Sequence, residues 1–230
     1  MKISQMTLGT VQLGKDYGVN NVNGQPSLSQ SFHILNTAYK GGVTVLDTSN
    51  DYGESEAVIG NYISQNPDKP FAICTKFNAS EKGSLSMYEA LKGFAQRSIE
   101  KLSVPQIQVF MSHTEDDFLN YGKELTDALD ELKKEGLILN TGISLSNKDN
   151  LERILDSASF DAIQLPINIL DNKEIRLGLV RKMSDLGIIV FVRSIYLQGL
   201  FFQKPEMLKN TKLAAAAPLV ERIQQVARQE

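Results

Sequence analysis

The stretch VTVLDTSNDYGESEAVIGNYISQ, residues 43–65, contains a complete strand, loop and helix. The run VTVLDTS opens with β-branched and apolar residues and ends in polar ones, which predicts a strand over 43–49. Asp51 and Tyr52 follow in a polar loop, and the apolar residues beyond them recur with a helical period. The stretch therefore predicts one βα unit whose helix covers 55–65.

The same order of a short strand and a longer helix repeats along the chain. The strand candidates are residues 6–12, 43–49, 71–77, 107–112, 139–145, 160–167 and 188–194. The helix candidates are residues 28–41, 55–65, 86–102, 116–135, 148–157, 172–186 and 215–229. Strands that are apolar on both faces and joined by long crossovers are typical of a parallel sheet covered by helices.

Roughly 30 residues per unit favours an α/β fold of the (β/α)8 TIM barrel type over a doubly wound open sheet. The segment LGTVQLG at 8–14 does not match the GxGxxG fingerprint of the open sheet, which argues in the same direction. We predict a single domain over residues 1–230 with seven βα units. Because an open seven-stranded barrel would leave two unpaired edges, we expect a last strand and helix beyond Glu230.

The composition narrows the class of protein. The chain is 42% hydrophobic and 22% charged with a net charge of -3, so nothing indicates a nucleic acid or an anionic membrane as partner. With one cysteine, Cys74, and two histidines we expect neither a disulfide framework nor a metal site. No signal peptide and no run of roughly 18 apolar residues is evident, which predicts a soluble, cytoplasmic protein.

Polar side chains stand at the carboxyl ends of successive predicted strands, where barrel enzymes carry their catalytic groups. Asp47 ends the second strand, Tyr52 lies in its loop, Lys76 ends the third and His113 follows the fourth. The later strand ends offer Ser144, Gln164, Asn168, Arg193 and Ser194. Taken singly, each of the first four fits a turn, a surface aromatic, a loop charge or a helix cap. Their conjunction predicts one site, and Asp51 is left as a loop residue without a role.

A phenol, an ammonium, a carboxylate and an imidazole suit the reduction of a carbonyl group. The usual pKa of a tyrosine is about 10, and a neighbouring ammonium lowers it while a carboxylate keeps that ammonium in place and charged. The imidazole adds a hydrogen-bond donor for a carbonyl oxygen. Such a set can protonate an oxygen that becomes negative when a hydride reaches the carbon. A Schiff-base aldolase that uses Lys76 stays open as an alternative.

Seven motifs resemble those of the aldo-keto reductase superfamily. They are LGTVQLG (8–14), LDTSNDYGESEAVIG (46–60), CTKF (74–77), MSHTEDD (111–117), TGISLS (141–146), IQLPIN (163–168) and VRSIYLQGLF (192–201). The resemblance covers essentially the whole chain. It implies a (β/α)8 barrel that binds NADPH, with NADH as the open alternative, and reduces an aldehyde or ketone to an alcohol. The partner is then a small carbonyl compound.

The resemblance also implies roles for single residues. Tyr52 resembles the general acid, Lys76 and Asp47 the pair that tunes it, and His113 the residue that orients the carbonyl. The cofactor-binding residues that it implies are Thr10, Asp47, Ser144, Gln164, Ser194, Leu197 and Gly199. Ser144 and Gln164 resemble the side chains that hold the nicotinamide carboxamide, and Asp47 would lie near the nicotinamide ribose. Ser194, Leu197 and Gly199 resemble the segment that covers the pyrophosphate. Many members have Ser-Asn where this chain has Ser144-Leu145. The side chain for one contact to the nicotinamide carboxamide is therefore missing, and Asn168 is a candidate to supply it. A cofactor-binding regulatory or scaffold protein with little turnover remains the second hypothesis.

Overall fold

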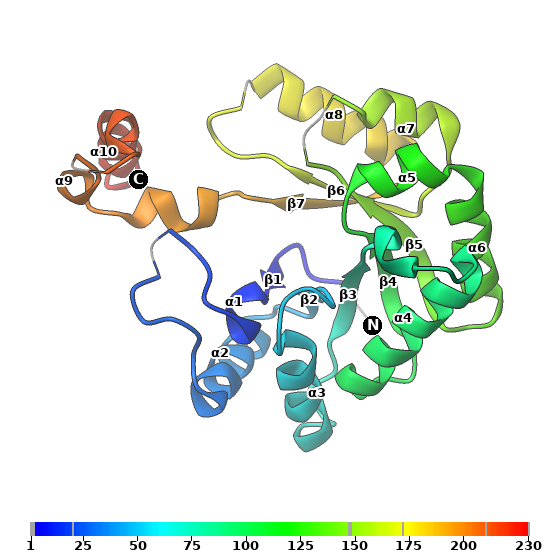
Figure 1. Cartoon of the computed structure of the whole chain (residues 1–230). Coiled ribbons are helices and arrows are strands. Elements are labelled where there is room, and N and C mark those ends of the chain that lie inside the picture. The colour runs from blue at the N-terminus through cyan, green and yellow to red at the C-terminus, as the bar shows by residue number, and fades with distance from the viewer. Residues whose placement is uncertain (1–2, 20, 147–148, 172, 210, 230) are drawn as a thin grey trace.

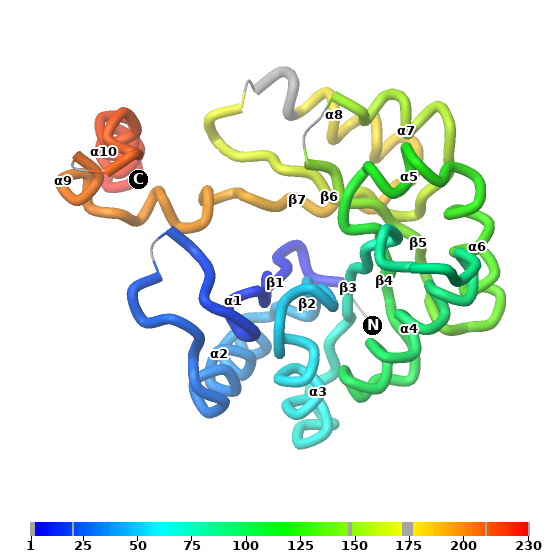
Figure 2. The backbone as a smooth tube through the Cα atoms, in the orientation of Figure 1, coloured from blue at the N-terminus to red at the C-terminus, as the bar shows by residue number. Residues whose placement is uncertain are grey.

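The computed structural model describes residues 3–19, 21–146, 149–171, 173–209 and 211–229. Within them seven strands form one parallel sheet in chain order, and each strand pairs with the next (Figure 1). The strands are β1 (Thr7–Gly9), β2 (Val45–Asp47), β3 (Ala72–Phe77), β4 (Ile107–Ser112), β5 (Ile138–Ser144), β6 (Ala162–Pro166) and β7 (Ile189–Arg193). The sheet curls without a pairing between β1 and β7 in the described residues (Figure 2). The predicted fold class, a (β/α)8 barrel of which seven units are visible, is confirmed.

Helices connect the strands and cover the outside of the curl (Figure 1). They are α1 (Val11–Gly14), α2 (Leu28–Lys40), α3 (Ser55–Gln65), η1 (Ala79–Lys82), α4 (Met87–Leu102), α5 (Glu115–Tyr121), α6 (Lys123–Lys134), α7 (Leu151–Ser157) and α8 (Lys173–Asp185). After β7 follow η2 (Leu197–Phe202), α9 (Pro205–Leu208), η3 (Ala214–Ala216) and α10 (Ala217–Ala227). None of the helices in the described part of the chain has the length and apolar character to cross a bilayer.

Strands β2 to β6 are largely buried on both faces, which explains why they are mostly apolar, whereas the edge strands β1 and β7 are partly exposed. On the outside, Phe77 and Phe110 pack with their ring centroids 4.6 Å apart in a core shared with α4 and α6. On the inside, Cys74, Met111 and Phe191 belong to a smaller apolar cluster contributed by the strands themselves. Apolar side chains thus line the inside of the curl, and the polar groups stand at the strand ends.

Most predicted strands and helices agree with the structure to within two residues, but two predictions were wrong. The strand predicted over 6–12 ends at Gly9, because the chain turns into the short helix α1 from Val11. The single helix predicted over 116–135 is two helices, since Gly122 has φ +49 and interrupts it. Residues 148 and 172, at which two predicted helices begin, lie outside the described residues.

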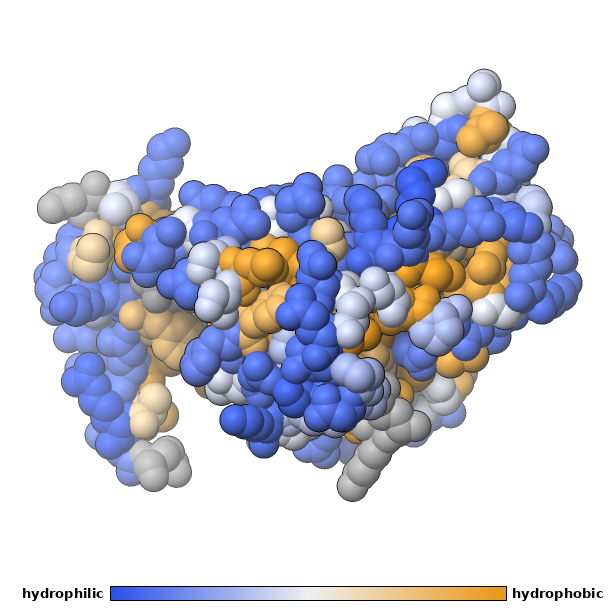
Figure 3. Space-filling view, turned by 90° about the horizontal axis from the view of Figure 1, so that it is seen from below, coloured by the Kyte–Doolittle hydropathy of each residue, from blue (hydrophilic) through white to orange (hydrophobic). Residues whose placement is uncertain are grey.

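The segment after β7 forms a lobe of its own, which Figure 3 shows at the left edge of the surface. Leu208, Ala217 and Val220 form a separate small core there, with Leu200 packed against it. A backbone hydrogen bond connects the lobe to the long loop after α1: the Val19 N–H donates to the Gln198 carbonyl at 3.0 Å. This contact joins the two ends of the open curl near the carboxyl edge of the sheet.

Candidate active site

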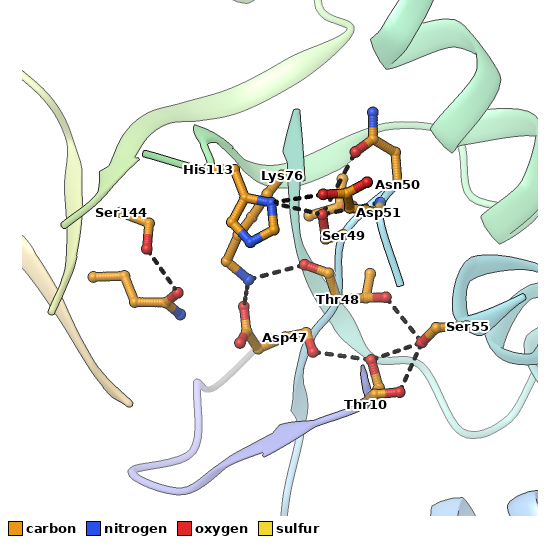
Figure 4. A network of polar contacts seen from close by, with 12 residues as sticks. Thr10, Asp47, Thr48, Ser49, Asn50, Asp51, Ser55, Lys76, His113 and Ser144 are labelled. Atoms are coloured by element: carbon orange, nitrogen blue, oxygen red, sulfur yellow. Dashed lines mark hydrogen bonds and ion pairs between the residues drawn. The ribbon is translucent and has the colours of Figure 1, made fainter. Parts of the chain in front are cut away.

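Asp47, Lys76 and His113 come together because their strands are parallel neighbours. Asp47 ends β2, Lys76 lies next to the end of β3, and His113 follows β4, so all three stand at the same edge of the sheet. The backbone N–H of His113 bonds the Phe77 carbonyl at 2.8 Å and carries the register one residue beyond the strand. Figure 4 shows the three side chains converging above that edge.

Lys76 is a buried cation with two oxygen partners. Its ammonium forms an ion pair with Asp47 and donates to the Thr48 carbonyl at 2.9 Å, while only 1% of its side chain is exposed. Burial alone would lower the pKa of Lys76, but the Asp47 carboxylate outweighs it and holds that pKa above its usual range. The amine therefore stays protonated. A Schiff base needs a neutral amine, so this environment speaks against the aldolase alternative.

The ring of Tyr52 lies next to both Lys76 and His113. The Lys76 Nζ atom is 5.3 Å from the ring centroid, and the His113 ring stands edge-on at 5.7 Å. Burial raises the pKa of Tyr52 above 10.0, although the positive charge of Lys76 acts to lower it. We expected the ammonium to prevail, and in the free protein burial prevails instead. The phenol is consequently protonated at neutral pH and has a proton to donate.

Two glycines that the sequence analysis did not single out hold the Tyr52 loop in place. A Cβ atom on Gly14 would lie 1.7 Å from the Tyr52 carbonyl oxygen, and one on Gly53 would lie 2.4 Å from the Gly14 carbonyl oxygen. Gly53 also has φ +55, a conformation that favours glycine. Backbone therefore packs directly on backbone here. The glycines of LGTVQLG and DYG were visible signals, but their mutual contact was not.

Thr10 contributes to the support of the Asp47 strand end. It is fully buried, and both its N–H and its hydroxyl donate to the Asp47 carbonyl oxygen, at 3.0 and 2.9 Å. The Ser55 hydroxyl donates to the Thr10 carbonyl at 2.9 Å, and the Thr48 hydroxyl donates to Ser55 at 3.0 Å (Figure 4). This network ties β1, β2 and α3 together under the site. A cofactor contact for Thr10 stays a prediction.

His113 is partly buried beside two groups of the β2 loop. Its Nδ1 atom lies 3.4 Å from the Ser49 hydroxyl oxygen and 3.7 Å from a carboxylate oxygen of Asp51. Burial lowers the pKa of His113, and the charge of Lys76 lowers it further. The imidazole is therefore neutral at neutral pH. Asp51, to which the sequence analysis gave no role, lies at this ring.

The residues predicted to hold a nicotinamide carboxamide are neighbours at the ends of β5 and β6. Ser144 and Gln164 pair in register, and the Ser144 hydroxyl donates to Gln164 Oε1 at 3.2 Å. Gln164 is largely buried, and within the described residues its side-chain N–H groups make no hydrogen bond, although their nitrogen is not fully enclosed. Such donors fit a carboxamide oxygen. Asn168 uses its side-chain oxygen locally, as the acceptor of the Leu170 N–H at 2.9 Å.

The loop after β7, predicted to cover the pyrophosphate, has an unusual backbone. Ser194, Leu197, Gln198 and Gly199 all have positive φ, at 62, 47, 56 and 88 degrees. Three of them carry a Cβ atom, and such residues keep this conformation only where the surroundings enforce it. The Arg193 side chain supports the start of the loop by donating to the Leu145 carbonyl at 2.7 Å and to the Ser194 hydroxyl at 3.3 Å.

Known proteins resemble this chain in sequence and in fold. The model of the aldo/keto reductase family matches residues 5–230. The chain belongs to the aldo/keto reductase family. A similar member, the aldo-keto reductase str7 of Strobilurus tenacellus, is 27% identical over 200 residues, which are 84% of this chain and 57% of that protein. The chain thus spans little more than half the length of this family relative, and the resemblance predicted from the motifs is confirmed.

Solved structures of other family members share the fold. A putative aldo-keto reductase from Pseudomonas aeruginosa superposes with a TM-score of 0.69 at 22% identity, covering 84% of this chain and 74% of the other. An aldo-keto reductase of Bombyx mori in complex with NADP superposes with a TM-score of 0.63 at 20% identity, covering 82% and 62%. At these identities the superpositions show that the fold is shared.

Proposed function

We propose that this chain belongs to an NADPH-dependent oxidoreductase that reduces an aldehyde or ketone to an alcohol, with Tyr52 as the general acid. The observation that carries the proposal is the packing of the Tyr52 phenol against the buried Asp47–Lys76 pair and His113 at one strand edge. The nicotinamide cofactor, when bound, supplies the hydride. The NADP complex of the Bombyx mori relative supports NADPH as that cofactor.

The charges around Tyr52 suit proton donation to an oxygen that becomes negative. The phenol keeps its proton in the free protein, because burial raises its pKa. When the proton leaves, the phenolate lies beside the Lys76 ammonium, which stabilises it. Asp47 in turn keeps that ammonium charged and fixed. His113, edge-on to the phenol, contacts the carbonyl oxygen in this proposal.

The remaining predicted residues bind the cofactor in the proposal. The free N–H groups of Gln164, held next to Ser144, bind the carboxamide. Ser194, Leu197 and Gly199 lie in the loop that covers the pyrophosphate. Asp47 lies near the ribose, and Thr10 supports it from below.

The direct test measures NADPH oxidation with a panel of simple aldehydes and cofactor binding by fluorescence. We expect Tyr52→Phe to lower turnover by about 10² to 10⁴ fold, the usual contribution of a general acid, and to leave cofactor binding nearly unchanged. Tyr39→Phe removes a hydroxyl that donates to the Asp68 carbonyl ahead of β3, at the opposite end of that strand from Lys76. It is the matched control and should retain full turnover. Substantial turnover by Tyr52→Phe would contradict the assigned role.

The same measurement separates the second hypothesis from the first. A chain that binds NADPH but oxidises it with no member of the panel would support a regulatory or scaffold function on this barrel. A chain that shows both binding and turnover, with turnover lost in Tyr52→Phe, supports the reductase.

A further inference from the structure

Arg193, the last residue of β7, belongs to the inner face of the curled sheet. Side chains alternate between the two faces of a strand. Phe191, two residues before Arg193, is part of the inner apolar cluster, whereas Val190 packs against the outer core. On the neighbouring strand β6, Phe191 pairs with Gln164. Arg193 therefore stands one inner layer beyond Gln164, at the carboxyl edge of the sheet.

Two hydrogen bonds hold the guanidinium group of Arg193 beside residues that the proposed function assigns to the cofactor. One goes to the carbonyl of Leu145, the residue after Ser144, at 2.7 Å. The other goes to the hydroxyl of Ser194 at 3.3 Å. Both acceptors are uncharged, so these bonds fix the guanidinium group without neutralising it.

The positive charge of Arg193 has no carboxylate partner in the described part of the chain. None of the ion pairs there includes it, whereas Lys76, a second cation of the inner face, is paired with Asp47. The side chain of Arg193 is half-buried. Its charge acts into the site, because Arg193 is one of the groups that lower the pKa of His113. A fixed and unpaired cation thus stands at the predicted nicotinamide end of the site.

The nicotinamide ring differs in charge between the two forms of the cofactor. It is neutral in NADPH and carries one positive charge in NADP+, after a hydride has left with its electron pair. A fixed cation repels the charged ring and has little effect on the neutral one. In the proposed function Gln164 binds the carboxamide of this ring, and Arg193 lies one layer from Gln164.

We infer that Arg193 is a specificity-determining residue for the redox form of the cofactor, because its unpaired charge favours binding of NADPH over binding of NADP+. The inference rests on the proposed function, which assigns the carboxamide to Gln164 and Ser144. Its consequence is weak product inhibition. The oxidised cofactor that remains after carbonyl reduction competes poorly with NADPH for the free protein.

Isothermal titration calorimetry with NADPH and with NADP+ tests the inference through the ratio of the two dissociation constants. Arg193→Gln should lower the ratio of the Kd of NADP+ to the Kd of NADPH by about 3- to 10-fold, as expected for the loss of one repulsion between charges near a protein surface. Arg193→Lys keeps the charge and should retain most of the ratio. The loop after β7 loses hydrogen bonds in both variants, which weakens both forms of the cofactor alike and leaves the ratio unchanged. An unchanged ratio in Arg193→Gln, or an equal fall in Arg193→Lys, would overturn the inference.

Arg181→Gln is the matched control, because it removes the same charge from an exposed position on α8. It should leave the ratio of the two dissociation constants in place. A fall in this variant as well would assign the effect to the net charge of the protein and contradict a role of Arg193. In assays of carbonyl reduction, inhibition by NADP+ should be stronger in Arg193→Gln than in Arg181→Gln.

A measurement without cofactor checks that the charge of Arg193 acts inside the site. Lys76 and Arg193 lower the pKa of His113, and Asp51 and Asp47 raise it. Arg193→Gln should therefore raise the pKa of His113 in an NMR titration of the cofactor-free chain, and a pKa that stays in place would overturn the inference. Binding of both cofactor forms with an unchanged ratio contradicts the role of Arg193 alone. If neither form binds, the proposed function and this inference fail together.

Discussion

The Lys76 ammonium is almost completely buried, and its pairing with Asp47 and the Thr48 carbonyl offsets the cost of removing this charge from water. A buried ion pair is costly to desolvate, and removing one member leaves the other unpaired, which is more costly still. Here the pair joins the ends of β2 and β3 directly under the Tyr52 ring. The residue that adjusts the phenol thus also stabilises the edge of the sheet.

Lys76→Met should abolish turnover and lower the free energy of unfolding by about 3 kcal/mol, because the Asp47 carboxylate loses its cation. Urea denaturation measures the second effect. The double variant Lys76→Met/Asp47→Asn should recover part of the stability and none of the turnover, since no unpaired charge remains but the phenol is still without its ammonium. Equal stability of the single and double variants would contradict this account.

The short helix α1 matters at the scale of the elements, because its last residue contacts the Tyr52 loop. Gly14→Ala would force a Cβ atom into the Tyr52 carbonyl oxygen. We expect it to lower the free energy of unfolding by about 1–3 kcal/mol and to reduce turnover, as the loop must shift. Gly9→Ala in β1, where a Cβ atom meets nothing within 4 Å, is the control for denaturation and activity assays. Similar effects of both substitutions would contradict the packing argument.

The first residue of α5 is hydrogen-bonded to the loop after β5. Glu115 is 3% exposed and accepts from both the N–H and the hydroxyl of Ser146, each at 2.7 Å. Burial alone would raise the pKa of Glu115, but these bonds hold it below its usual range. A lowered pKa means that the carboxylate contributes stability above its unfolded pKa, and that this contribution is lost as the pH falls through the folded pKa.

Glu115→Gln should therefore cost about 1–2 kcal/mol of unfolding free energy at about pH 7, and less in acid, once the pH has fallen through the lowered folded pKa of the native carboxyl. Urea denaturation of both proteins at neutral pH and in acid measures the difference. Asp116→Asn, an exposed neighbour on the same helix, should change little at either pH. A cost that does not shrink in acid would show that the charge of Glu115 is not what holds the loop.

The whole molecule consists of the curled sheet with its helices and the lobe after β7. Within the lobe, α10 is held to η2 and the residue after it, because Gln224 donates to the Phe201 carbonyl at 2.9 Å and to the Gln203 carbonyl at 2.8 Å. Its own apolar core is small. Elements with few buried contacts open locally at lower free energy than the core of a domain.

Gln224→Ala should accelerate amide hydrogen exchange in α10, by an amount that corresponds to about 1 kcal/mol, and leave the exchange of β4 and α4 unchanged. Gln225→Ala, one residue along on the exposed side of the same helix, is the control. Faster exchange throughout the chain would mean that the lobe and the curled sheet unfold together.

The order of strands and helices was predictable because it depends on local pattern. Strands that are buried on both faces must be apolar throughout, and the barrel architecture follows from their alternation with helices. The same reasoning missed the break at Gly122 and the early end of β1, since both depend on one residue's backbone. For the site, Asp47, Tyr52, Lys76 and His113 could be chosen from their places after strands.

By itself, the sequence determined that seven βα units form a curled parallel sheet and that four reactive side chains follow its strands. Only the tertiary structure decided how those side chains behave, because pKa values depend on distance and burial rather than on the order of residues in the chain. Burial raises the pKa of Tyr52, so the phenol keeps its proton, although the charge of Lys76 acts to lower that pKa. Likewise, the approach of Asp51 to His113 results from a loop held by Asn78 and Lys15, both distant in sequence.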